Sequence, residues 1–184
     1  MMFDPTIFDN LKVVMEGRLY DLDAEGSIRI TGREDLVDLA SMSRTFRMTL
    51  QPVSGRCQAV ITLSSGITDF VMERRIARPA DQRPGAELQL VLILPAPYSD
   101  YAAAVQDYLV RLWGEEAEIA HELTVTLQPE AEPEGGGTSS VPEAYRIRIR
   151  FAHKIDESHI EDLEQWLDIA AMCLVHVEER KNFE

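Results

Sequence analysis

Three arginines alternate with apolar residues in the segment YRIRIRF. Successive side chains of a β-strand point to opposite faces, so Arg146, Arg148 and Arg150 share one face and the apolar residues share the other. Arg29 and Arg47 occupy equivalent alternating positions in other predicted strands. Guanidinium groups bind carboxylates and phosphates through paired hydrogen bonds. The sequence therefore predicts an arginine-lined sheet face suited to binding an anionic group.

This arginine face belongs to a strongly acidic chain. The 184 residues include 32 acidic and 18 basic side chains, a net charge of −14. Residues 112–145 contain eight glutamates and no Lys or Arg. Such a balance repels nucleic acid and anionic membrane surfaces, so neither is expected as a partner. The arginine face instead predicts an acidic protein segment, or a second copy of the chain. Pairing with Glu122 and the acidic stretch, which would leave a solvated surface, is the alternative.

No other group of side chains predicts a catalytic centre. His153, Asp156 and His159 lie close in sequence, but a metal requires three or four ligands in a fixed geometry, and the spacing of a helical ligand pair is absent. His121 and His176 have no companion in the sequence and are interpreted as structural. The carboxylate pairs carry no sign of the desolvation that acid–base catalysis needs. We therefore predict no catalytic residue, no metal and no cofactor, and favour a protein that is not an enzyme.

The elements that must position the arginines follow from the periodicity of the apolar residues. Asp4 and Pro5 predict the start of a first helix, and Gly17 predicts its end. The segments RLYDLD and SIRIT flank the tripeptide AEG and predict a hairpin. Thr31 and Glu34 have the spacing of a capping box, which predicts a short helix after the hairpin.

The following segments alternate between predicted strands and helices. RTFRMTLQ and RCQAVITL predict two strands joined by a turn at PVSG, and a helix is expected over 66–77. ELQLVLIL is nearly all apolar and predicts a central strand buried on both faces. A helix from Ser99 to Gly114 precedes the strands HELTVTLQ and AYRIRIRF, and a last helix is expected over 158–179.

The strand HELTVTLQ has a two-residue period like that of its neighbour. Leu123, Val125 and Leu127 are expected to face the core, and Glu122 is expected to point outward beside the arginines. Between the two strands, residues 129–143 form an acidic segment rich in Gly and Pro that cannot support a core. This segment predicts a long hairpin loop.

The order of these elements predicts an α+β fold, with a mixed or antiparallel sheet and helices packed on one face. The tetrapeptide TLQP ends a predicted strand at 49–52 and again at 126–129. This match predicts an internal duplication of a β-α-β-β-α unit, and a ferredoxin-like path is one form it could take. Strand–helix alternation without duplication would give the same order. We expect residues 1–84 to hold an initial α-β-β segment and the first unit, residues 85–184 to hold the second, and both to form one compact domain.

Composition also bears on where the chain acts. The sequence has no signal peptide and no run of about 18 apolar residues that would span a membrane. Its two cysteines, Cys57 and Cys173, lie in unrelated settings and are expected to be reduced. These features predict a cytoplasmic protein.

The functional prediction is a non-enzymatic interaction or regulatory protein, such as an adaptor or a chaperone for one client, which binds through the arginine-lined face. The alternative is a small-molecule-binding protein or enzyme whose arginines hold an anionic ligand in a cleft between the two units. A broad open face would favour the first hypothesis. A concave pocket with a desolvated carboxyl group would favour the second.

Overall fold

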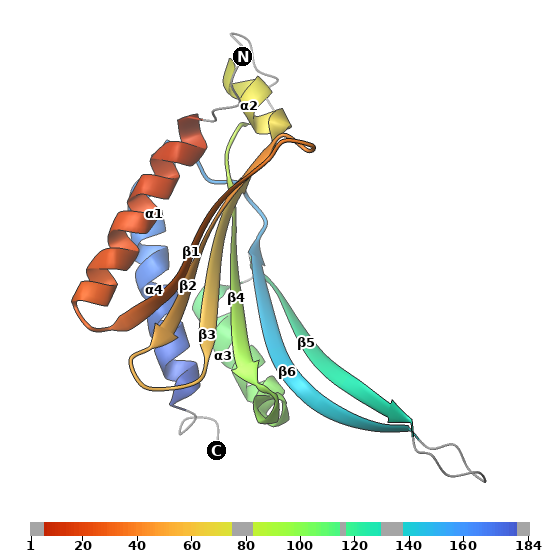
Figure 1. The fold of residues 1–184 in the computed structure, drawn as a ribbon. Helices are drawn as coiled ribbons and strands as arrows, with labels where there is room; N and C mark the ends of the chain where they lie inside the picture. The colour runs from red at the N-terminus through yellow and green to blue at the C-terminus, as the bar shows by residue number, and fades with distance from the viewer. Residues whose placement is uncertain (1–5, 75–82, 115–116, 130–137, 180–184) are drawn as a thin grey trace.

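A computed structural model describes residues 6–74, 83–114, 117–129 and 138–179. It has the predicted α+β fold: a six-stranded antiparallel sheet in the order β1-β2-β3-β4-β6-β5, with α1, α3 and α4 on one face (Figure 1). The elements are α1 (Thr6–Ala24), β1 (Ile28–Asp38), β2 (Ser43–Pro52), β3 (Gln58–Ser65), α2 (Ile67–Arg74), β4 (Glu87–Pro95), η1 (Ala96–Tyr101), α3 (Ala102–Trp113), β5 (Ala117–Pro129), β6 (Thr138–Phe151), η2 (Glu157–His159) and α4 (Ile160–Glu178).

Helix α1 is longer than the sequence predicted. Gly17 lies in its interior, and the segment RLYDLD, predicted as a strand, forms part of the same helix. The buried side chains of Phe8 and Met15 are followed by those of Leu19 and Leu22, so the apolar face continues past the glycine. A Cβ atom at position 17 would meet no atom within 4 Å. The prediction that Gly17 ends the helix is therefore wrong.

The short helix predicted after Thr31 is also wrong, because these residues lie in strand β1. The register between β1 and β2 shifts between Ile30 and Gly32, which places a β-bulge at Thr31. After the bulge Arg33 and Asp35 lie opposite Met48 and Phe46, two side chains buried under the helices. After the bulge the inward positions are occupied by charged residues, so the apolar alternation that marks a strand is absent.

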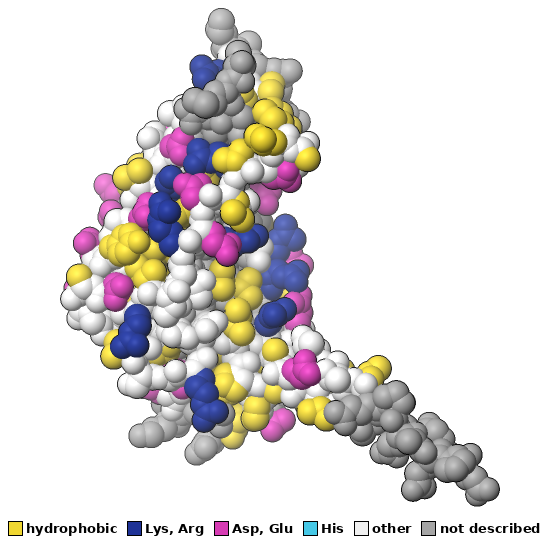
Figure 2. All heavy atoms as spheres, in the orientation of Figure 1, with side chains coloured by type: hydrophobic (Ala, Val, Ile, Leu, Met, Phe, Trp, Pro, Cys, Tyr) yellow, Lys and Arg dark blue, Asp and Glu magenta, His cyan; other side chains and the backbone are white. Residues whose placement is uncertain are grey.

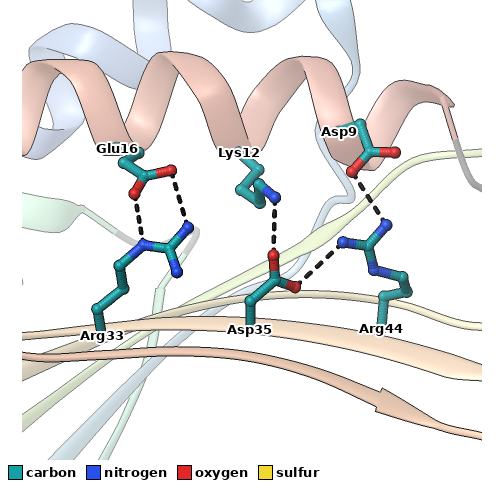
Figure 3. A network of polar contacts seen from close by, with 6 residues as sticks. All are labelled: Asp9, Lys12, Glu16, Arg33, Asp35 and Arg44. Carbon is teal, nitrogen blue, oxygen red and sulfur yellow. Dashed lines mark hydrogen bonds and ion pairs between the residues drawn. The ribbon is translucent and has the colours of Figure 1, made fainter.

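Ion pairs join this edge of the sheet to α1 (Figure 3). The charged residues are Asp9, Lys12 and Glu16 on α1, Arg33 and Asp35 on β1, and Arg44 on β2. Asp35 is central, because its two carboxylate oxygens lie 2.7 Å from Lys12 Nζ and 3.1 Å from Arg44 Nη2. Burial raises the pKa of Asp35, but hydrogen bonds from Lys12 and Arg44 outweigh this effect and lower the pKa below its ordinary value. Carboxylates and cations thus neutralise one another where α1 covers β1.

Strands β2, β3, β4 and β6 form the centre of the sheet. The predicted hairpin of β2 and β3 is confirmed, and β4 lies between β3 and β6. Burial of β4 alternates along the strand: Leu90 and Leu92 are fully buried, whereas Val91 and Ile93 are only partly buried. The prediction of burial on both faces is therefore wrong, because helices cover one face only.

Strands β5 and β6 continue beyond the helices as an arm, which we define as residues 122–129 and 138–144 (Figure 1). Leu123, Val125 and Leu127 were expected in the core but are 46%, 40% and 63% exposed. They follow His121 in the alternation of β5, yet the helices do not cover this end. Strand β6 begins inside the predicted loop 129–143, and residues 130–137 lie outside the described ranges.

Helix α4 supplies much of the core, and its C-terminal end is hydrogen-bonded to the β2–β3 turn. Glu178 Oε2 accepts hydrogen bonds from the backbone N–H groups of Arg56, at 3.0 Å, and Cys57, at 2.8 Å. Gly55 in this turn has a φ of 151°, and a Cβ atom there would lie 2.3 Å from Cδ of Glu178. Both cysteines are buried and form no disulfide, and burial raises the pKa of Cys173 to about 12.

The internal duplication is not confirmed. No helix lies between β1 and β2, which form a hairpin, whereas α3 lies between β4 and β5. A ferredoxin-like path requires a helix after its first strand, so residues 28–95 do not trace one. The two TLQP segments do end strands, β2 and β5. The predicted helices over 66–77, 99–114 and 158–179 correspond to α2, α3 and α4, although residues 75–77 lie outside the described ranges.

Candidate partner-binding face

The face of the sheet opposite the helices, here called the open face, carries all five arginines singled out by the sequence. The strand register places them there, because each arginine is next in its strand to a residue whose side chain is buried on the helix side. The same face carries the polar and aliphatic residues Glu34, Thr49, Val60, Thr62, Gln89, Val91, Ile93, Glu118, Ala120 and Glu122.

Arg146, Arg148 and Arg150 form a column along β6, here called the arginine column. On β4 they face Ile93, Val91 and Gln89 in turn, and Val91 faces Val60 on β3. Val60, Val91 and Ile93 therefore form an aliphatic strip on the side of the column towards β3. Figure 2 shows this face, with dark blue side chains over β6 beside yellow ones over β3 and β4.

The members of the arginine column differ in their partners. Arg148 forms an ion pair with Glu122 on β5, and each side chain is 41% exposed. Arg146 lies directly opposite Glu122 in the register. Neither Arg146 nor Arg150 forms an ion pair among the described residues. The sequence prediction that Glu122 lies beside the arginines is confirmed. Two of the three guanidinium groups remain available to a ligand.

The other two predicted arginines lie on the same face but away from the column. Two strands, β3 and β4, lie between Arg47 on β2 and the column on β6, a separation of roughly 14 Å across the sheet. Arg47 pairs with Glu34 at 3.1 Å, and both side chains are largely exposed. Arg29 on the edge strand β1 lies one strand farther away. The structure thus brings together three of the five predicted residues.

A groove of about 410 Å³ adjoins Arg150 at one end of the open face. Its wall includes Gln89, Glu118, His153 and Lys154. The Lys154 ammonium lies 2.8 Å from the buried carboxylate of Asp69, so its charge is already balanced. The acids and bases of this groove are mixed, which distinguishes it from the arginine column.

Two histidines interpreted as isolated do have companions. His121 Nδ1 contacts the Tyr145 hydroxyl, and His121 Nε2 lies 2.7 Å from Gln106 Oε1 on α3. Burial lowers the pKa of His121 and raises that of Tyr145 to about 12, so both are neutral near pH 7. His176 stacks on Tyr108 with ring centroids 4.3 Å apart. The sequence signal for His121 is its inward position in the alternation of β5.

Of the three residues weighed as a metal site, Asp156 and His159 instead form a helix cap, and His153 lines the groove. The Asp156 carboxylate accepts a hydrogen bond from the Ser158 backbone N–H at 2.9 Å. His159 Nδ1 accepts one from the Asp156 N–H, which completes a capping box around η2. Among the residues that the structure describes, no group of three or more His, Cys, Asp or Glu side chains is arranged to hold a metal ion.

Comparison with known proteins gives no family model, no curated protein and no solved structure that matches this chain. Within the described ranges, no helix is both long and apolar enough to cross a membrane.

Proposed function

We propose that this chain is a non-enzymatic interaction protein, an adaptor or chaperone-like protein, which binds an acidic segment of a partner along the arginine column. The observation that carries the proposal is the column itself: three arginines in register on an exposed sheet face, two of them without an ion pair among the described residues. Arginine binds carboxylates through two parallel hydrogen bonds, which favours this class of ligand.

The charge of the open face supports this choice of partner. The whole chain carries −14, yet on the open face Arg146, Arg148 and Arg150 form one column, and the carboxylates opposite them on β5 are those of Glu118 and Glu122. An acidic segment is therefore repelled by most of the molecular surface and attracted to this one face. Such a field selects one mode of approach and raises the rate of association.

The aliphatic strip argues for a peptide over an isolated anion. Val60, Val91 and Ile93 provide an apolar surface that a partner's aliphatic or aromatic side chain would cover. An extended segment that alternates acidic and apolar residues would place its carboxylates on the column and its apolar side chains on the strip. The proposed ligand therefore has both kinds of residue.

An enzymatic role has less support from the surroundings of the arginines. The carboxylates nearest Arg150 in the groove, Glu87 and Glu118, are exposed, and a catalytic carboxyl group needs desolvation. Burial does raise the pKa of Glu73, but this residue lies on α2 and accepts a hydrogen bond from the Thr6 backbone. The groove of about 410 Å³ supports a second candidate function, binding of a small anionic molecule beside Arg150.

A library of phage-displayed random peptides tests the proposal, with the full chain as bait. We expect selected peptides to be enriched in Asp and Glu interspersed with aliphatic residues. Arg146→Glu combined with Arg150→Glu should weaken their binding by about tenfold or more, since charge-assisted hydrogen bonds are lost and repulsion is introduced. Arg148 is left unchanged, because its reversal would also break the pair with Glu122.

Arg111→Glu is the matched control, because Arg111 is exposed on α3, on the helix side of the sheet. Arg111→Glu changes the net charge by as much as each substitution of the double variant does, and it should retain peptide binding. Selected peptides without acidic enrichment, or equal binding by the double variant, would contradict the docking proposal. If peptides fail and a small dicarboxylate such as succinate raises the melting temperature in an Arg150-dependent manner, the second candidate function is favoured.

A further inference from the structure

Strand β5 ends the sheet with an unpaired edge. It is the last strand in the order, and among the described residues it pairs only with β6. Edge strands usually carry lysines, internal prolines or bulges that prevent pairing with another strand. Strand β5 has no Lys or Arg, its only proline is the terminal Pro129, and the irregular residue of the hairpin is on β6. Its outer backbone groups are therefore suited to pair with another strand.

The side chains of the arm give this edge an apolar face. Leu123, Val125 and Leu127 alternate on the helix side of the sheet and are 46%, 40% and 63% exposed. A row of half-exposed aliphatic side chains next to a free strand edge is a surface that association would cover.

The sequence of β5 is complementary to itself when two copies run antiparallel. Strand β5 runs from Ala117 to Pro129, so its central residue is Leu123. In the register centred there, Leu123 faces Leu123 of the second copy, His121 faces Val125, and Ile119 faces Leu127. On the opposite face Glu122 lies across from Thr124, and Ala120 from Thr126. No pair within 119–127 opposes like charges, and the aliphatic residues meet on one side.

We propose that the chain forms a two-fold homodimer through antiparallel pairing of β5 with β5 of a second copy, centred on Leu123. The two-fold axis makes every contact occur twice, as in other isologous interfaces. It joins two six-stranded sheets into one continuous sheet. This interface is separate from the arginine column, so it goes beyond the proposed function.

Helix α3 explains how the exposed aliphatic residues become covered. It packs over the first half of β5, where Gln106 contacts His121 at 2.7 Å. Antiparallel pairing places the first half of one β5 beside the second half of the other. Each α3 is thereby brought towards Val125 and Leu127 of the other copy. Val110 on α3, which is 42% exposed, would contact these side chains. Association through β5 therefore pairs the backbone edges of the two strands and also buries their apolar side chains.

The second copy is a better occupant of this edge than a strand of another protein. The register matches the full length of β5 with itself and avoids facing charges, which a foreign strand would have to reproduce. The opposite edge strand, β1, is joined to α1 by ion pairs, and its exposed Leu36 and Val37 point to opposite faces, so they form no apolar row. Because each copy carries −14, the dimer should tighten as salt screens the repulsion between copies.

Analytical ultracentrifugation of the full chain, with variants, tests the dimer. The wild type should sediment at twice the monomer mass of 20.8 kDa. Leu123→Lys should reduce the mass to that of the monomer, because two lysines would face each other on the axis. Met172→Lys is the control: Met172 is 61% exposed on α4, and this variant should remain dimeric. Circular dichroism checks that both variants fold.

Cysteine cross-linking tests the register. Leu123→Cys should form a disulfide-linked dimer under mild oxidation, because opposed Cβ atoms of an antiparallel pair lie within reach of a disulfide. Val125→Cys, which faces His121 of the other copy, should cross-link far less. The native thiols are buried and do not interfere.

A wild type that is monomeric at every soluble concentration overturns the inference, as does a Leu123→Lys variant that stays dimeric. Cross-linking by Val125→Cys and not by Leu123→Cys overturns the register. The arginine variants leave β5 intact, so a failure of peptide binding and a failure of dimerisation are distinguishable.

Discussion

The two edge strands of the sheet, β1 and β5, differ in their cover by helices and in the side chains they carry. At β1 charged side chains lie beneath α1, each matched by an opposite charge within hydrogen-bond distance (Figure 3). At β5 the helices stop short, and aliphatic side chains remain half exposed. An edge covered by its own helix can hold ion pairs in place of an apolar core. An edge left uncovered, with apolar side chains, is available to another chain.

The most damaging change at the β1 edge is Asp35→Ala. It would leave Lys12 and Arg44, whose side chains are 17% and 13% exposed, without their shared carboxylate. We expect a loss of about 2–3 kcal/mol in the free energy of unfolding, measured by urea denaturation. Arg47→Ala removes an exposed pair from the same region and should cost about 0.5 kcal/mol or less. Equal losses of unfolding free energy in the two variants would show that burial beneath α1 does not strengthen the ion pairs.

The two edges should also respond to acid at different pH values. The folded state lowers the pKa of His121, so the unfolded chain takes up this proton first, and stability falls as the pH drops below about 6.5. The pKa of Asp35 is likewise lowered, but its stabilising effect is retained above about pH 3.9 and is lost only in stronger acid.

Urea denaturation between about pH 7.5 and about pH 5.5 isolates the contribution of His121. His121→Gln should lose less stability over this interval than the wild type does. The Asp35→Ala variant should lose as much as the wild type. An equal loss of stability in His121→Gln and the wild type would argue against a neutral, partly buried imidazole on β5.

A stabilising change is expected in the helix that covers the β1 edge. Gly17 is exposed inside α1, and a Cβ atom there would have open space. Gly17→Ala should therefore raise the free energy of unfolding by about 0.5–1 kcal/mol through helix propensity. Gly55→Ala is its counterpart, since the Cβ atom would overlap Glu178 and the variant should be destabilised. Thermal denaturation of both variants compares a dispensable glycine with a required one.

The sequence predicted the elements whose patterns are regular, and failed where a local irregularity broke the pattern. The alternation in β2, β3 and β6 and the cap at Gly114 predicted these elements correctly. After the bulge at Thr31 the inward positions of β1 carry Arg33 and Asp35, so the apolar alternation of a strand was hidden. Gly17 resembled a stop signal, although nothing at that position requires the helix to end.

The candidate face was predictable in its composition and not in its extent. Alternation alone placed Arg146, Arg148 and Arg150 together, because their order on one strand fixes their face. It could not show that two strands separate Arg47 from the column, since the order of strands depends on long-range pairing. Nor could it show that Leu123 and Leu127 lie uncovered, because a two-residue period gives the face of a side chain but not the reach of the helices above it.

The hydrogen bonds from the β2–β3 turn to Glu178 have a consequence for biosynthesis. The acceptor lies 122 residues after the Arg56 N–H that donates to it. At ordinary rates of translation, that stretch takes roughly 6–24 s to synthesise. During this interval the inner face of the β2–β3 hairpin has α1 for cover but not α4. The nascent sheet is therefore held in an incomplete form until the last helix leaves the ribosome.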